Sequence, residues 1–269
     1  MTTIVGDVAN LYRGPAGMLK LARDPADNDL IGREAAALGW LAGQGDPRYL
    51  PYVPGLLGTC GFRDPDTGVV RRGNALGVLD GFADLAFVAA RFPAGLDPRD
   101  VAWIWRRLLV ALGFAHRAGI VHGAVLPPHL LIQPTEHGLT LVDWCYATGG
   151  PRPGALPAVP AGYRDWYPPE VRCGYVPGPD LDIYLGTKCM LALLAGRQTP
   201  TPPPGGGHMP GPLPDGGRLP APLAAFAAGC LLANPRRRPD DAWALLRELD
   251  EVLERLYGPR RFRPFPSLN

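Results

Sequence analysis

Lysine is almost absent from this chain of 269 residues. Only Lys20 and Lys188 among its 27 basic residues are lysines, so arginine supplies the other 25. Together with 35 glycines and 33 prolines, this composition indicates a GC-rich, bacterial genome. In such a chain a lysine at a motif position is less readily explained by chance.

Cysteine pairs, long apolar runs and a strong net charge are also lacking. The five cysteines form no C-x-x-C pair and are odd in number, which predicts buried free thiols rather than a disulfide framework. No apolar run approaches the ~18 residues that span a bilayer, and no charged-then-apolar leader opens the chain. We therefore expect a cytoplasmic protein without membrane contact. A net charge of +2 is too small to predict nucleic-acid binding.

Apolar periodicity predicts a strand-rich first part and a helical second part. In the first part, the patterns predict one helix over residues 29–42 and strands over 8–13, 18–22, 56–62 and 69–79. In the second part, caps and helical spacing predict helices over 98–118, 182–195 and 240–257. A stretch rich in proline and glycine, residues 199–222, is predicted to be irregular.

The most informative segment runs from His122 to Cys145. It reads His-Gly-Ala-Val-Leu-Pro-Pro-His over residues 122–129 and Asp-Trp-Cys over 143–145. This resembles the catalytic loop and metal-binding segment of a protein kinase, in which H-R-D-L-x-x-x-N precedes D-F-G. By this resemblance Ala124 stands at the position of the catalytic Asp, and a methyl group cannot accept a proton. Leu126 likewise replaces the loop lysine that faces the transferred phosphoryl group.

Further kinase-like positions concern the nucleotide. Lys20 and Glu34 resemble the ion pair that holds the α- and β-phosphates; the alternative is a surface lysine beside a solvated helix glutamate. Asp84 resembles a ribose contact or simply caps the next helix, and Leu131 belongs to the apolar residues that would pack under an adenine. The loop from Gly6 to Tyr12 keeps one glycine of G-x-G-x-x-G, so we expect it to contribute little to ATP binding.

The metal site is only partly kept. Asp143 resembles the aspartate that binds a divalent ion, which would be Mg²⁺ or Mn²⁺ accompanying ATP. His129 stands in place of the second ligand, an asparagine. Imidazole is a poor ligand for Mg²⁺ but suits Mn²⁺ or Zn²⁺; alternatively, His129 is hydrogen-bonded within the loop. Trp144 and Cys145 replace Phe-Gly, which predicts a fixed rather than switching segment.

The residues that hold a kinase fold together are better preserved in this sequence than those that carry kinase catalysis. Glu170 and Arg238 resemble a buried ion pair of kinases, Asp182 resembles the helix aspartate that holds the catalytic-loop backbone, and His122 is expected to be a buried structural residue. The resemblance therefore implies an α+β, bilobal, protein-kinase-like fold, similar to a bacterial serine/threonine kinase-type pseudokinase. A small strand-rich N-lobe with one helix is expected over residues 1–80, a larger helical C-lobe over 81–258 and a tail over 259–269.

Three functions remain open after this comparison. The first is a pseudokinase, a nucleotide-responsive binding or regulatory module whose protein partner is a regulated kinase or another effector. The second is an ATP-dependent phosphoryl or nucleotidyl transferase with an atypical catalytic loop, and the third is a structural role without nucleotide. The stretch 199–222 is either a partner-binding surface or a plain flexible loop.

Overall fold

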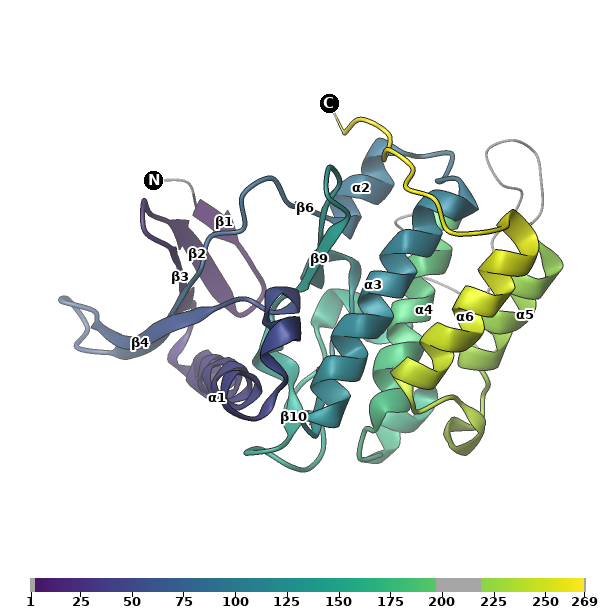
Figure 1. The fold of residues 1–269 in the computed structure, drawn as a ribbon. Coiled ribbons are helices and arrows are strands. Elements are labelled where there is room, and N and C mark those ends of the chain that lie inside the picture. Colours follow the sequence, from purple (N-terminus) through teal and green to yellow (C-terminus); the bar gives the residue numbers. More distant parts are fainter. Residues whose placement is uncertain (1–2, 197–218, 269) are drawn as a thin grey trace.

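The structure, a computed structural model, describes residues 3–196 and 219–268. A strand-rich part carrying one long helix lies beside a larger part made mainly of helices (Figure 1). This is the bilobal α+β arrangement expected from the sequence. Lys20 and Glu34 of the first part meet Asp143 of the second where the two parts adjoin.

The strand-rich part is a five-stranded antiparallel sheet in the order β1-β2-β3-β5-β4. Its strands are β1 (Thr3–Val5), β2 (Ala9–Arg13), β3 (Met18–Ala22), β4 (Leu56–Arg63) and β5 (Val70–Leu76). Helix α1 (Asn28–Gln44) packs against β5, with Ile31, Leu38 and Leu41 buried along one face at helical spacing.

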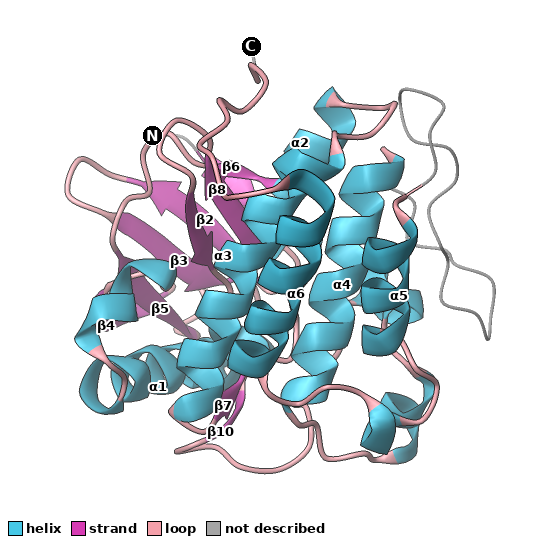
Figure 2. Ribbon diagram, turned by 45° about the vertical axis from the view of Figure 1, so that its right-hand side comes forward, coloured by secondary structure: helices cyan, strands magenta, loops and turns pink. Residues whose placement is uncertain are grey.

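The helices of the larger part are α2 (Leu85–Arg91), α3 (Pro98–Arg117), α4 (Pro179–Ala195), α5 (Ala221–Cys230) and α6 (Ala242–Tyr257). Helix α3 lies beside both α4 and α6 (Figure 2), and it contributes large buried side chains such as Trp105, Leu108 and Leu112 to the core. The Asp97 carboxylate accepts a hydrogen bond from the Arg99 amide and Pro98 follows at the first helical position, so local sequence sets where α3 begins.

Short strands position the loop residues. Strands β6 (Ala83–Asp84), β8 (Leu130–Gln133) and β9 (Gly138–Leu141) form one small sheet, and β7 (Ile120–Val121) pairs with β10 (Thr148–Gly149). Strand β8 begins directly after His129, and β9 ends two residues before Asp143. The Val142 amide donates to the His129 carbonyl at 2.9 Å, so this hairpin holds the two side chains next to each other.

Scaffold contacts agree with the sequence expectation. Arg238 Nη1 lies 2.5 Å from Glu170 Oε1 and 3.4 Å from Asp180 Oδ2, with the guanidinium almost fully buried. The Asp182 carboxylate accepts from the backbone amides of His122 at 2.7 Å and Gly123 at 2.8 Å. The backbone of the loop that begins at His122 is therefore fixed by α4.

Some sequence predictions were wrong in detail. Helix α4 begins at Pro179 rather than Asp182, because Gly178 occupies the cap position and proline is favoured in the first turn. Residues 221 and 222 lie in α5 rather than in an irregular stretch, again with proline in the first turn. The part of that stretch from 197 to 218 lies outside the described residues.

Two of the five cysteines are exposed, against the prediction of buried thiols. Cys60 lies on the edge strand β4 and Cys173 in a short helical turn, whereas Cys145, Cys189 and Cys230 are buried. No helix of residues 3–196 or 219–268 combines the length and hydropathy needed to cross a membrane.

Candidate functional site

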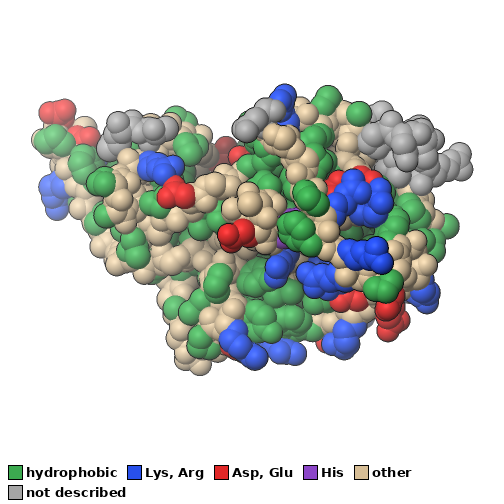
Figure 3. Space-filling view, turned by 45° about the horizontal axis from the view of Figure 1, so that its top comes forward, with side chains coloured by type: hydrophobic (Ala, Val, Ile, Leu, Met, Phe, Trp, Pro, Cys, Tyr) green, Lys and Arg blue, Asp and Glu red, His purple; other side chains and the backbone are tan. Residues whose placement is uncertain are grey.

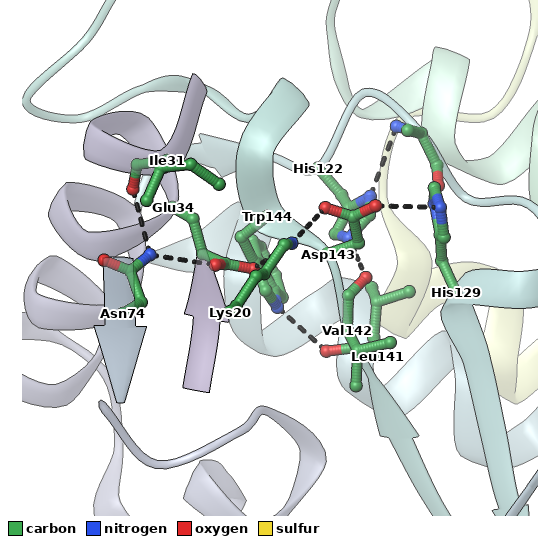
Figure 4. Close-up of polar contacts among 11 residues, drawn as sticks. Lys20, Ile31, Glu34, Asn74, His122, His129, Leu141, Val142, Asp143 and Trp144 are labelled. Carbon is green, nitrogen blue, oxygen red and sulfur yellow. Dashed lines mark hydrogen bonds and ion pairs between the residues drawn. The ribbon is translucent and has the colours of Figure 1, made fainter. Parts of the chain in front are cut away.

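Lys20 lies at the centre of the site. It is the middle residue of β3, paired with strands on both sides, and its side chain is 6% exposed. Its Nζ lies 2.9 Å from Glu34 Oε1 and 2.5 Å from Asp143 Oδ1. This burial excludes the alternative of a surface lysine. The ammonium joins a helix of the strand-rich part to a loop of the larger part (Figure 4).

Asn74 on β5 is a second hydrogen-bond partner of Glu34, and the sequence analysis did not predict it. Its Nδ2 donates to Glu34 Oε2 and to the Ile31 carbonyl, each at 2.9 Å. Both side chains are fully buried or nearly so. Glu34 is thus held from two directions, by Lys20 and by the amide. The signal in the sequence was a polar residue within an otherwise core-facing part of a strand.

The Asp143 carboxylate lies between two nitrogen atoms, one from Lys20 and one from His129. Its Oδ1 contacts Lys20, and its Oδ2 lies 3.0 Å from His129 Nε2. Its backbone adopts a left-handed conformation with φ of 65°. In this conformation the carboxylate lies between Lys20 and His129. Trp144, directly after it, is fully buried and donates from Nε1 to the Leu141 carbonyl at 2.8 Å. A tryptophan packed in this way favours the fixed segment expected from the sequence.

The electrostatics of the site follow from burial and mutual contact. Burial alone would lower the pKa of Lys20, but the Asp143 and Glu34 carboxylates offset it, and the pKa is raised well above its usual value. Burial would raise the pKa of Asp143, but Lys20 and His129 hold it well below the usual range. The pKa of His129 is raised, because the Asp143 carboxylate outweighs the opposing effect of burial.

His129 uses both of its ring nitrogens inside the protein. Nδ1 lies 2.8 Å from the Ala124 carbonyl while Nε2 contacts Asp143. The alternative of a loop hydrogen bond is therefore present in the structure, and no nitrogen is left over as a metal ligand. His122, fully buried, has its Nε2 3.0 Å from the Val142 carbonyl, and burial lowers its pKa to about 4. His122 is thus a neutral structural residue.

The position that resembles the catalytic base of kinases is occupied by a buried alanine. Ala124, Val125 and Leu126 are all fully buried. The Gly123 backbone lies so close to the Leu156 side chain that a Cβ added there would come within 2.6 Å of it. Leu156 from the later segment therefore packs on the loop at this point.

A divalent metal does not fit these residues well. Atoms of Glu34, Asp143 and Cys145 lie within 4.8 Å of one another, but Lys20 Nζ already contacts both carboxylates. Burial raises the pKa of the Cys145 thiol well above its usual range, so it stays neutral and is a weak ligand. His129 offers donors where Mg²⁺ requires oxygen lone pairs.

The remaining predicted nucleotide residues, Asp84 and Leu131, lie side by side on neighbouring strands of the small sheet. Asp84 caps α2, its Oδ1 accepting from the Phe87 amide at 2.7 Å, and it is the register partner of Leu131 in the small sheet. A ribose contact for Asp84 and an adenine contact for Leu131 stay predictions. Between β1 and β2 the chain makes a tight turn, in which the Gly6 amide donates to the Ala9 carbonyl at 2.9 Å.

Comparisons with known proteins agree on the fold. No protein-family model matches the chain. Over 117 residues it is 28% identical to casein kinase II subunit alpha' of Saccharomyces cerevisiae, a match covering 38% of this chain and only 30% of the yeast protein. The kinase domain of PknI from Mycobacterium tuberculosis superimposes with a TM-score of 0.66 at 20% identity, covering 93% of each chain. The chain therefore has the bilobal fold of protein kinases.

Proposed function

We propose that this kinase-fold chain is a pseudokinase, a bacterial, cytoplasmic regulatory module that binds a nucleotide and a protein partner without transferring phosphate. The observation that carries the proposal is the state of Ala124. It stands at the base position, is fully buried, and its carbonyl accepts a hydrogen bond from His129. Fold alone does not determine function, so the proposal depends on this position.

Nucleotide binding is the part of kinase chemistry that the residues still support. Lys20 is a fixed ammonium oriented by Glu34, which is the arrangement that a phosphate group needs. A triphosphate would compete with Asp143 for Lys20, so binding would loosen the direct contact between the two parts of the chain. This offers a route by which ATP changes how the parts sit and what a partner meets.

A transferase is the second candidate, favoured by the intact contacts among Lys20, Glu34 and Asp143. Phosphoryl transfer depends mainly on positioning and charge, and loss of a general base costs about 10²–10⁴-fold rather than all activity. Against it stand Leu126 in place of the loop lysine and the packing over the loop.

Two measurements separate these functions. Thermal unfolding with ATP, at a concentration of about 100 Kd, should raise the midpoint by about 5–10 °C. Incubation with γ-labelled and α-labelled ATP should then give no label on the protein or on generic substrates. Label transfer that disappears in Asp143→Asn would refute the pseudokinase and favour the transferase, and absence of any thermal shift would remove nucleotide from both.

An apolar pocket supports binding of a protein partner. It lies between α2, the loop that contains Pro127, and α4. Its lining residues are Leu85, Ala86, Ala89, Pro127, Tyr163, Trp166, Cys189, Ala192 and Leu193. An apolar side chain of a regulated kinase or other effector would suit this lining. Ala192→Phe should fill the pocket; a purified partner that binds this variant as tightly as the wild type would show that the pocket is not its site.

A further inference from the structure

We infer that the C-terminal tail, residues 259–268, completes an arginine surface that binds an acidic segment of a partner protein. The arginine surface consists of Arg106 and Arg107 on α3 and Arg260 on the tail. None of these residues lines the apolar pocket or contacts Lys20. Binding here goes beyond the proposed function, because it requires neither a nucleotide nor the pocket.

Aromatic side chains hold the tail against the helical part of the chain. The Phe262 ring stacks on His137 with a centroid distance of 4.6 Å, and His137 stacks in turn on Trp103 at 4.2 Å. Phe265 makes T-shaped contacts with Trp103 at 5.7 Å and with Phe92 at 6.2 Å. Aromatic rings in these arrangements attract each other beyond the effect of the area that they bury. The tail therefore packs across α3 and the turn that precedes β9.

An ion pair fixes the position of the tail along α3. Arg263 Nε lies 2.8 Å from Asp100 Oδ1, and its Nη2 lies 3.4 Å from Asp97 Oδ2. The Asp100 side chain is only 1% exposed, and a buried carboxylate without its partner would be strongly unfavourable. Arg263 is therefore required by the fold, and its charge is already compensated, so it is not counted in the arginine surface.

The packed tail places Arg260 near the two arginines of α3. Burial lowers the pKa of the Arg106 guanidinium, and the charges of Arg260 and Arg107 lower it further. Burial also lowers the pKa of His137, and Arg107 and Arg260 act in the same direction. The three guanidinium groups thus lie within electrostatic range of one another. Figure 3, in which the top of Figure 1 comes forward, shows basic side chains gathered on the helical part.

Carboxylates compensate only part of this charge. Arg106 pairs with Asp250, but Arg107 donates to two neutral acceptors, the His137 carbonyl and the Tyr52 hydroxyl, each at 2.9 Å. In the part of the chain that the structure describes, no carboxylate forms an ion pair with Arg107 or Arg260. Like charges that are held close together repel each other, and a negatively charged partner would remove this repulsion.

The exposure of the surface determines which anion suits it. A single small anion would gain little, because one exposed ion pair contributes little, whereas a row of carboxylates meets both uncompensated guanidinium groups. The Phe262 ring, which is 68% exposed, offers an adjacent contact for an apolar side chain, and arginine and aromatic residues are enriched in protein interfaces. The net charge of +2 for the whole chain provides no broad field for a nucleic acid. An acidic segment with one apolar side chain fits these features.

Fluorescence anisotropy with a labelled peptide tests this surface. The probe is Glu-Glu-Glu-Phe-Glu-Glu-Glu, titrated with the whole chain at low salt and without nucleotide, and the control is the same peptide with Gln in place of Glu. The acidic peptide should bind at least about tenfold more tightly than the control, and its affinity should fall as salt screens the exposed charges. The inference would be overturned by no saturable binding, by equal affinity for both peptides, or by tighter binding of an oligonucleotide of equal charge.

Three variants locate the binding surface, with melting temperatures measured to show that each is folded. Arg260→Glu should weaken binding of the acidic peptide at least about fivefold. Arg237→Glu is the matched control, since it changes the net charge equally at an exposed position before the other end of α6, and it should stay within about twofold. Phe265→Ala keeps every charge but loosens the tail, and should weaken binding at least about threefold. Equal weakening by Arg237→Glu would show that only net charge matters, and unchanged affinity in Phe265→Ala would refute the role of the packed tail.

Discussion

Replacing Lys20 by methionine should destabilise the fold much more than an ordinary lysine substitution. The ammonium is shared between Glu34, whose side chain is fully buried, and Asp143, whose side chain is 21% exposed. Methionine has similar length and fills the same space, so the change removes charge without opening a cavity. What remains is a buried carboxylate with an amide partner only, and a second carboxylate that keeps His129.

The magnitude follows from the buried pair. Removing one partner of a buried ion pair costs about 3–5 kcal/mol in the free energy of unfolding, and for a domain of this size that lowers the melting temperature by roughly 10 °C. Urea unfolding followed by tryptophan fluorescence would give the free energy directly. Because the pKa of Asp143 is held well below its usual range, its stabilising contribution is present above about pH 4 and is lost as the pH falls through the folded-state pKa.

Lys188 provides the matched control, since it is the other lysine of the chain. Its Nζ donates to the carbonyls of Asp165 and Trp166 rather than to carboxylates, so Lys188→Met should cost only about 1–2 kcal/mol. In addition, Glu34→Gln should recover part of the loss when combined with Lys20→Met, because it removes the stranded charge. Equal stability of Lys20→Met and wild type, or no recovery in the double variant, would refute the buried-pair explanation.

Three further outcomes are expected. Asn74→Leu should lower the free energy of unfolding by about 2 kcal/mol, because a buried carboxylate loses a hydrogen bond, and should speed amide exchange in α1; unchanged exchange there would contradict the role of this amide. Ala124→Asp should yield no label transfer and should lower the melting temperature, since a carboxylate enters a fully buried position; a gain of transfer above tenfold would show that this single residue is what prevents catalysis. At pH 8 an amine-reactive probe should modify Lys188, whose pKa burial lowers to about 8, well before Lys20, as measured by mass spectrometry; the reverse order would show that Lys20 is not paired.

Much of the fold could be predicted because its signals are local. Strand β3 was expected at residues 18–22 and is found there, and α3 begins at the proline that follows its capping aspartate. Strand β1 was missed because its three residues are all exposed and show no alternation. Helix α5 was missed because its 10 residues carry too little periodicity to be recognised, whereas α2, with 7 residues, was foreseen only as the helix that Asp84 would cap and was given no bounds.

The site could be predicted only where a family pattern fixed the order of residues. The contacts of Lys20 with Glu34 and Asp143 join positions that are 14 and 123 residues apart, and the kinase resemblance placed all three. Asn74 belongs to no family pattern that the sequence analysis used. Its partners lie on a helix, 43 and 40 residues earlier in the chain. The two alternatives for His129 depended on where its ring nitrogens point, and only the fold of the β8–β9 hairpin determines that.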